Sequence, residues 1–96
     1  MSRYAAGRRR EYRCQEILEA AGYLTIRAAS SKGIADVVAM GPGKIRFISV
    51  KSGSSRPSPA EREGLEYLAE SLKGHATVEC WSFPFRTRHP IIEVFR

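Results

Sequence analysis

The stretch Ile34–Lys51, IADVVAMGPGKIRFISVK, contains two runs of apolar and β-branched residues on either side of Gly41-Pro42-Gly43-Lys44. Glycine and proline between two such runs are typical of a hairpin turn. The sequence therefore predicts two antiparallel strands, over Ile34–Met40 and Ile45–Lys51. These strands decide the fold, because the other elements pair with them or pack on them.

The length of the turn decides which side chains share a face of the sheet. If the turn is a four-residue loop, Met40 pairs with Ile45, and counting back places Asp36 opposite Ser49. Side chains alternate along a strand, so Asp36, Ser49 and Lys51 would then project on one face. A three-residue loop would shift the register by one residue and send them to opposite faces.

In the four-residue register, a carboxylate and an ammonium group share an otherwise apolar surface with Val38 and Phe47. Burying Asp36 and Lys51 there costs free energy unless they pair with each other or with a metal ion. The pattern leaves two interpretations open, a structural ion pair and a reactive site.

The flanking sequence predicts two helices and three more strands. Arg3–Ala21 lacks proline, has apolar residues at helical spacing and is followed by Gly22, so it is predicted to be an amphipathic helix. The remaining predicted elements are a strand over Tyr23–Ala28, a helix that starts with the capping box of Ser58 and Glu61 and stops at Gly74, and strands over Thr77–Phe83 and Ile91–Phe95. The fold class is therefore α/β, with element order α-β-β-β-α-β-β and a central mixed sheet flanked by helices.

The first helix carries a carboxylate on its apolar stripe. Glu11 lies on the same face as Cys14 and Leu18, where an apolar residue is expected. A charge on the packing face is typical of a site residue, although the side chain can also extend to solvent.

Length and composition narrow the class of protein. A chain of 96 residues, 43% of them hydrophobic, predicts one domain over residues 1–96. It has no apolar run of about 20 residues and no signal-peptide pattern, so we expect a soluble, intracellular (cytoplasmic) protein without a membrane partner. Cys14 and Cys80 are expected to be reduced core residues.

The charge balance favours a nucleic-acid partner. Sixteen Lys and Arg against ten Asp and Glu give a net charge of +6, and most of the excess lies near the N-terminus. Arginine clusters attract phosphate backbones. The alternative is an ordinary solubilising surface. The candidate DNA-binding residues in this cluster are Arg8, Arg9, Arg10 and Arg13.

Several segments taken together resemble the PD-(D/E)XK nuclease superfamily, and most closely its archaeal-type Holliday junction resolvases. The likeness runs from Gly7 to Phe95. It is carried by Glu11, Arg27, Ser30-Ser31-Lys32-Gly33, Ile34-Ala35-Asp36 and Ile48-Ser49-Val50-Lys51. The resemblance implies a restriction-endonuclease-like core.

The family's functional residues carry over onto matching positions of this chain. The resemblance assigns the helix glutamate to Glu11, the metal-binding aspartate to Asp36 and the catalytic lysine to Lys51. It also implies that Arg27 and the loop of Ser30, Ser31 and Lys32 contact the DNA backbone.

The chain departs from the family pattern at two positions. Ser49 stands where the second motif carboxylate is expected, and Tyr12 stands where the resolvases commonly have arginine. Some restriction enzymes of the superfamily also have Ser-x-Lys and supply the carboxylate from the following helix. Glu61 continues the inward stripe of that helix and is the best substitute, with the capping box as its alternative role; Glu63 and Glu66 lie off the stripe.

Phosphodiester hydrolysis requires an activated water and neutralisation of transition-state charge. Mg²⁺ prefers oxygen ligands and keeps several waters, so one or two carboxylates suffice. The expected ligands are Asp36, the carbonyl of Val50, and Glu61 or Glu11, with Mn²⁺ as a substitute ion. Lys51 is expected to orient or deprotonate the water.

The leading hypothesis is a Mg²⁺-dependent endonuclease that resolves Holliday junctions in DNA recombination and repair. Junction resolution needs two paired cuts, which implies a homodimer. Two alternatives are another small nuclease of the superfamily, such as a virus-type replication-repair nuclease, and a DNA-junction-binding module weakened in catalysis by Ser49.

Overall fold

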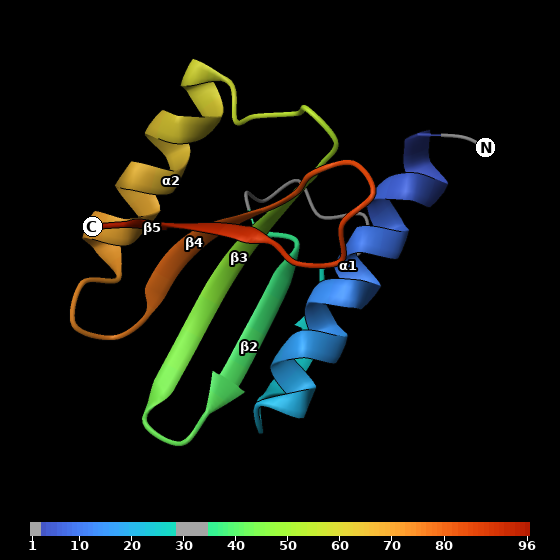
Figure 1. Cartoon of the computed structure of the whole chain (residues 1–96). Coiled ribbons are helices and arrows are strands. Elements are labelled where there is room, and N and C mark those ends of the chain that lie inside the picture. The colour runs from blue at the N-terminus through green and yellow to red at the C-terminus, as the bar shows by residue number, and fades with distance from the viewer. Residues whose placement is uncertain (1–2, 29–34) are drawn as a thin grey trace.

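The computed structural model describes residues 3–28 and 35–96, and for residues 3–8 it describes only the backbone. Figure 1 traces the chain through its elements in order. They are α1 (Arg3–Ala20), β1 (Leu24–Arg27), β2 (Val37–Gly41), β3 (Lys44–Ser52), α2 (Pro59–Ser71), β4 (Thr77–Phe83) and β5 (Ile91–Phe95). This order confirms the predicted α-β-β-β-α-β-β arrangement.

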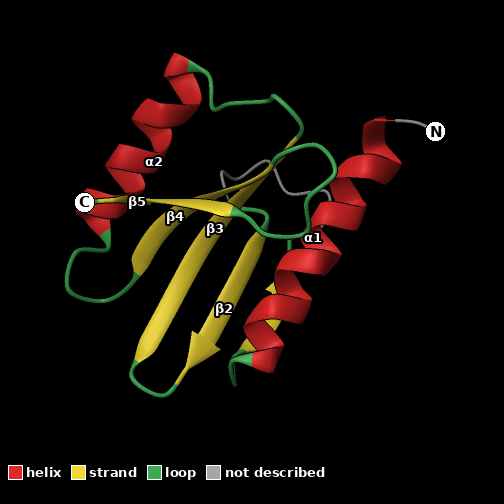
Figure 2. Cartoon of the chain, in the orientation of Figure 1, coloured by secondary structure: helices red, strands yellow, loops and turns green. Residues whose placement is uncertain are grey.

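The five strands form one mixed sheet in the order β1-β2-β3-β4-β5. β3 and β4 run parallel, and the other neighbouring strands are antiparallel. The helices lie on opposite faces of this sheet (Figure 2). The connection from β3 to β4 passes through α2, as a parallel pair requires.

Each helix closes a separate part of the core. On the α1 face, Cys14 and Leu18 pack against Val37, Ile48 and Trp81. On the α2 face, the main contacts are those of Leu65 and Ala69 with Val78, Cys80 and Phe95. Both cysteines are buried and free, which confirms the prediction that they are reduced core residues.

The turn between β2 and β3 differs in length from the prediction. Gly41 pairs with Lys44, so the turn contains only Pro42 and Gly43 and is not a four-residue loop. Gly43 has a positive φ of 72°, which favours glycine in this tight turn. Met40 nevertheless pairs with Ile45, so the predicted register of the ladder is confirmed.

The start of α2 also follows the sequence prediction. The Ser58 side chain accepts the N–H of Glu61, and the Glu61 side chain accepts the N–H of Ser58. This reciprocal capping box satisfies two backbone donors at the helix N-terminus. It also fixes the Glu61 carboxylate close to the end of β3, because the linker from Ser52 to Ser58 is short.

One buried charge was not anticipated from the sequence. Glu79 is 2% exposed and accepts two hydrogen bonds from Arg46, on the neighbouring strand, at 2.7 and 2.8 Å. Thr77 and Trp81 donate two more. Burial raises the pKa of Glu79, but these hydrogen bonds outweigh it and leave the pKa below its ordinary value. The carboxylate is therefore a satisfied ion inside the sheet.

Part of the sheet lacks a covering layer. Thr25 and Arg27 of β1 bond to side chains of α1, so Leu24 and Ile26 point to the opposite face. On that face α2 packs over β4 and β5, and it leaves Leu24 74% and Ile26 56% exposed. Met40 and Ile45 continue this apolar surface across β2 and β3.

In the described part of the chain, neither helix has the length and apolar character needed to cross a bilayer.

Candidate active site

The predicted site residues lie at the end of the sheet where the parallel strands β3 and β4 both finish. Lys51 and Ser82 pair across these two strands, one residue before each strand ends. Ligands of open α/β sheets characteristically bind at the carboxyl ends of parallel strands. The structure brings Asp36 and Glu61 to this same end.

Asp36 occupies a different position from the one predicted. β2 begins at Val37, whose partner is Ile48, so Asp36 precedes the ladder and is not paired with Ser49. Its backbone N–H instead donates to the carbonyl of Ile48, at 2.8 Å. Two consecutive residues thus face one residue of β3, as in a β-bulge, which re-aims the Asp36 side chain.

The re-aimed carboxylate completes the sheet in place of a backbone carbonyl. Oδ2 of Asp36 accepts the N–H of Val50 at 2.7 Å. Backbone N–H groups of a strand point along the plane of the sheet, so the carboxylate lies at the sheet end, between the layers of the two helices. The prediction that it projects on one face with Ser49 and Lys51 is wrong for this reason.

Lys51 pairs with a residue of α2. Its Nζ donates to Oε2 of Glu61 at 2.5 Å, and the Lys51 side chain is 20% exposed. The sequence had suggested an ion pair with Asp36 as one interpretation, but Asp36 bonds to backbone. The hydrogen bond from Lys51 and the backbone bond at Ser58 lower the pKa of Glu61 below its ordinary value.

Glu11 faces the same end of the sheet from α1. Its Oε1 forms an ion pair with Arg27 at 3.1 Å, and both side chains are about one-fifth exposed. The Arg27 guanidinium also lies over the ring of Tyr12, 4.9 Å from the centroid. Tyr12, the residue that departs from the resolvase pattern, therefore helps to hold the arginine that pairs with Glu11.

Ser49 is buried in the sheet. It is 3% exposed and pairs with Cys80 of β4, on the face that α2 covers. The motif position that lacks its carboxylate is thus enclosed by protein. A second acidic group at this end of the sheet has to come from a helix.

The electrostatics of Asp36 show that its surroundings disfavour its ionised form. Burial raises the pKa of Asp36 above its ordinary value, and the negative charges of Glu11 and Glu61 raise it further. The Val50 N–H and the positive charge of Lys51 act in the opposite direction but do not cancel the effect. Three carboxylates and one ammonium group are therefore close enough to influence one another.

These acidic groups come from three separate segments of the chain and do not form a ready-made metal cage. Among the described residues, no three His, Cys, Asp or Glu side chains stand close enough together to hold a metal ion. The donors available for a cation are hard carboxylate oxygens, which suit Mg²⁺ or Mn²⁺ more than a transition metal that prefers thiolate or imidazole. An excess of negative charge around Asp36 is the environment that a cation stabilises.

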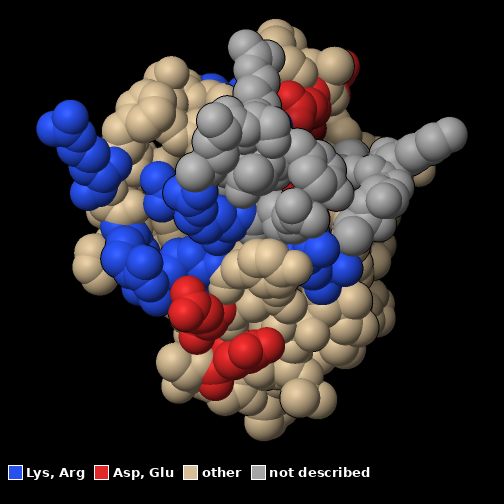
Figure 3. Space-filling view, turned by 90° about the vertical axis from the view of Figure 1, so that its right-hand side faces the viewer, with Lys and Arg blue, Asp and Glu red and all other residues tan. Residues whose placement is uncertain are grey.

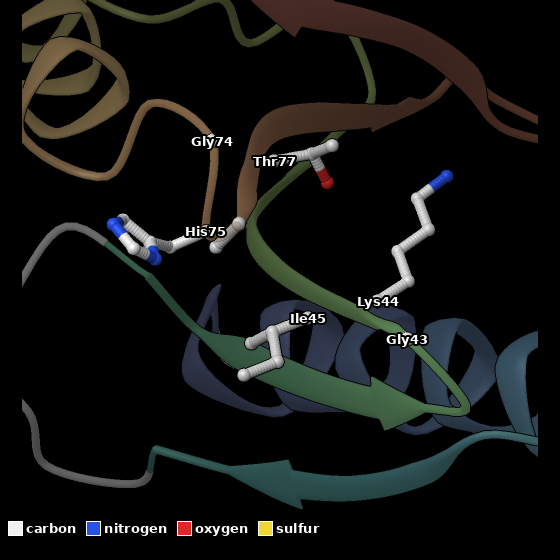
Figure 4. A pocket seen from close by; sticks show the side chains of 7 residues that line it. Gly43, Lys44, Ile45, Gly74, His75 and Thr77 are labelled. Carbon is white, nitrogen blue, oxygen red and sulfur yellow. The ribbon is translucent and has the colours of Figure 1, made fainter.

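A pocket of about 240 Å³ lies at the other end of the sheet (Figure 4). Its walls come from the β2–β3 turn and from the segment that leads into β4, including Lys44, His75 and Thr77. These residues stand at the amino ends of β3 and β4, opposite the ends that carry Lys51 and Ser82. The pocket is therefore separate from the candidate active site.

The arginines of α1 divide into groups with different surroundings. Arg10 and Arg13 donate to the carbonyls of Thr87 and Arg88 in the loop between β4 and β5, at 3.2 and 3.1 Å. Arg9 is exposed. Figure 3 shows lysine and arginine side chains gathered on this side of the molecule. The Arg8 side chain and the residues Ser30, Ser31 and Lys32 lie outside what the structure describes.

The loop of residues 84–90 adds charges that the sequence analysis did not assign to the site. The bonds from Arg10 and Arg13 place it against α1, where it presents Arg86 and Arg88. The segment between Pro84 and Pro90 has the sequence FRTRH. The basic residues of this segment could have indicated a contribution to DNA binding from the sequence alone. Only folding, however, brings them beside α1.

Comparisons with known proteins agree on one family. A model of the family described as archaeal Holliday junction resolvase (Hjc) matches residues 2–81. Among solved structures, the chain is similar to Hjc of Archaeoglobus fulgidus, a Holliday junction resolvase from an archaeal hyperthermophile. The TM-score is 0.71 at 25% sequence identity, over 94% of this chain and 71% of that one. No curated protein matches the sequence.

The raised pKa of Asp36 gives a prediction for stability. A carboxyl group whose pKa is higher in the folded than in the unfolded chain lowers the free energy of unfolding as pH rises through that pKa. Asp36→Asn removes this charge but keeps an oxygen for the Val50 N–H. We expect the variant to be more stable than the wild type at pH 7 in metal-free buffer, with a gain that shrinks towards pH 4, measured by chemical denaturation.

The matched control is Glu93→Gln, which removes an exposed carboxylate bonded to Arg62. This variant is expected to gain no stability at any pH. A lower stability of Asp36→Asn at pH 7 would contradict the inferred electrostatics.

Proposed function

Because the chain belongs to the archaeal Holliday junction resolvase family, we propose that it is a metal-dependent endonuclease that cuts branched DNA during recombination and repair. The family model covers residues 2–81, and therefore most of the chain and all of the candidate active-site residues. The four-way junction is the substrate that this membership favours.

The observation that carries the proposal is the gathering of Asp36, Lys51 and Glu61 at one end of the sheet. Asp36 and Lys51 match the family's metal-binding aspartate and catalytic lysine. Glu61 accepts a short hydrogen bond from Lys51. It also contributes negative charge around Asp36. A helix carboxylate thus reaches the region that the serine at position 49 leaves without one.

The residues present fit a hydrated divalent cation. Mg²⁺ keeps several waters and is commonly bound through one or two carboxylates, so the absence of a three-residue cluster among the described residues is compatible with it. We propose that Asp36 and Glu61 hold the ion, with the Val50 carbonyl and Glu11 as further oxygen ligands. Each oxygen of Glu61 already accepts one hydrogen bond, and a carboxylate oxygen has a second lone pair available.

The bound ion would neutralise charge on the phosphate and lower the pKa of a coordinated water. Lys51 supplies the part that the chain itself performs. Its side chain is 20% exposed and its positive charge acts on Asp36, so its ammonium group is suited to orient the attacking water and to offset charge on the phosphate. Glu61 positions Lys51, because the capping box fixes the carboxylate and the ion pair then fixes the ammonium group.

A first prediction separates chemistry from binding. Asp36→Asn and Lys51→Ala should each reduce cleavage of a four-way junction by several orders of magnitude. Asp36→Asn removes the charge of a metal ligand, and Lys51→Ala removes the ammonium group that orients the attacking water. Binding of DNA in Ca²⁺ should stay close to that of the wild type, because affinity comes mainly from phosphate contacts. Cleavage in Mg²⁺ and Mn²⁺ and electrophoretic binding assays measure both quantities. Near-normal cleavage by either variant would remove the proposed site.

A second prediction concerns the carboxylate that replaces the motif residue at Ser49. Glu61→Gln keeps the size of the side chain and its bond to the Ser58 N–H, so α2 should remain stable. It removes the charge that a hard cation and Lys51 require. We therefore expect a much lower cleavage rate and a higher Mg²⁺ requirement, measured by titration of the metal.

The rescue variant makes this test specific. Ser49→Glu in the Glu61→Gln background returns a carboxylate to the motif position and should restore part of the metal-dependent activity. Glu63→Gln is the matched control on an exposed turn of the same helix and should leave cleavage unchanged. Wild-type Mg²⁺ dependence of Glu61→Gln would exclude the substitution and leave Glu11 as the second carboxylate.

The buried serine also favours a second candidate function, a module that binds junctions without cutting them. Ser49 is enclosed at 3% exposure, and its hydroxyl supplies no carboxylate to an ion at this end of the sheet. Binding of junctions with no cleavage in Mg²⁺ or Mn²⁺ by the wild-type chain would establish this alternative. In that case, the chain would share with its family the recognition of junction DNA but not its cleavage.

We further propose that the chain acts as a homodimer through the uncovered face of the sheet. A junction is resolved by two symmetric cuts, which one active site cannot make together. Leu24, Ile26, Met40 and Ile45 form an apolar surface on three strands that α2 does not cover. Exposed apolar patches of this kind are typical of interaction sites, and a second copy would bury both of its equivalent patches.

The dimer proposal predicts that Ile26→Glu converts the protein to monomers, measured by light scattering or sedimentation at micromolar concentration. The charge would be buried without a partner at a self-complementary interface. Ile91→Glu is the matched control, because Ile91 is similarly exposed, at 60% against 56%, but lies on the opposite edge strand. A dimer that survives Ile26→Glu, or a monomeric wild type, would exclude this interface.

A further inference from the structure

The loop of residues 84–90, which joins β4 to β5, stands next to the candidate active site. It leaves β4 at Phe83, whose register partner is Ser52 of β3, one residue after Lys51. The N–H of Gly53 donates to the carbonyl of Phe83 at 2.9 Å, which ties the two strand ends together. Figure 1 shows the loop leaning towards α1. The match to the family model ends at residue 81, so this loop lies beyond the matched residues.

The loop is held in a defined shape. Arg10 and Arg13 of α1 donate to its carbonyls at Thr87 and Arg88. The hydroxyl of Thr87 accepts the N–H of His89. Arg86 has a positive φ of 62°, a conformation that non-glycine residues adopt only when their surroundings impose it. The loop is therefore organised before any ligand binds.

This shape presents an aromatic ring to solvent. Phe85 is 74% exposed, although burying it would be favourable by the hydrophobic effect. One side of its ring rests on the backbone of Gly53, where an added Cβ would come within 2.5 Å of Cζ of Phe85. Only a glycine permits this close approach. The ring thus contacts the residue that follows β3, while most of the Phe85 surface stays open to solvent.

Two arginines follow Phe85 in the loop. Arg86 follows it directly, and Arg88 is 69% exposed two residues later. An aromatic ring with a free face beside arginines is the combination that stacks on nucleic-acid bases and contacts the neighbouring phosphates. A protein partner would instead be favoured by a wider apolar surface without this excess of positive charge.

We infer that Phe85 is a specificity-determining residue that stacks on a base exposed at the branch point of the DNA. Bases inside a continuous duplex are covered on both faces by their neighbours, whereas strand exchange interrupts the stack. The ring adjoins the strand end that carries Lys51, so it would mark the branch point next to the phosphate that is cut. The inference rests on the proposed function for the choice of branched DNA as ligand.

The test compares a four-way junction with a continuous duplex of the same length, in Ca²⁺ so that binding is measured without cleavage. Phe85→Ala is expected to weaken junction binding by roughly ten-fold to a hundred-fold, the usual effect of losing one stacked base. Duplex binding should stay unchanged. Phe85→Tyr should retain the preference for the junction, because it keeps the ring.

Two control variants separate stacking from charge and from aromatic surface in general. Arg86→Gln is expected to weaken binding to junction and duplex alike and to lower the salt slope by about one unit. Tyr67→Ala removes an aromatic side chain of similar exposure, 66%, from α2 and should change neither affinity. Thermal unfolding checks that each variant is folded.

A fluorescent adenine analogue at the branch point reports the contact directly. Wild type and Phe85→Tyr should change its fluorescence on binding, and Phe85→Ala should not. Wild-type junction affinity in Phe85→Ala, or an equal loss for junction and duplex, would overturn the inference. Absence of cleavage in every variant, including the wild type, would contradict the proposed nuclease activity and leave these binding readouts valid.

Discussion

The pairing of β2 with β3 is the constraint on which the rest of the site depends. The two-residue turn sets the register, and the backbone ladder ends before Val50. The carboxylate of Asp36 then takes the place of a backbone acceptor for the Val50 N–H. One hydrogen bond therefore both closes the end of the sheet and fixes an acidic group where β3 delivers Lys51. Because β4 runs parallel to β3, its end and the loop after it arrive at the same place.

The site concentrates charges that the fold alone would not favour. Asp36 is partly buried among other carboxylates, so its pKa is raised and its ionised form is destabilising. By contrast, the buried carboxylate of Glu79 is satisfied inside the sheet, because it accepts four hydrogen bonds from Arg46, Thr77 and Trp81. The contrast distinguishes a carboxylate that is satisfied within the sheet from the one that we propose as a metal ligand. The ionised form of Asp36, which its surroundings disfavour, is the form that a bound cation would stabilise.

Helix ends and loops connect this site to the rest of the molecule. Glu61 caps α2 and holds Lys51 at the same time, so the stability of the helix start and the position of the ammonium group depend on one side chain. On the other side, Arg10 and Arg13 are engaged with the loop after β4. Part of the basic cluster of α1 thus shapes a second surface as well as adding positive charge. The face proposed to bind DNA is built from segments more than 70 residues apart in sequence.

The sequence by itself determined the fold class, the order of elements and the capping box, because each follows from local periodicity and turn chemistry. It left the pairing of Met40 with Ile45 dependent on the length of the turn. The sequence also identified the motif residues on which the family resemblance rested. Tertiary structure decided the rest. The bulge at Asp36 moved its carboxylate from the face into the end of the sheet, and the partner of Lys51 proved to be Glu61. The position of the exposed Phe85 ring depends on its contact with Gly53. Each of these depends on distances between segments remote in the chain, which no local pattern encodes.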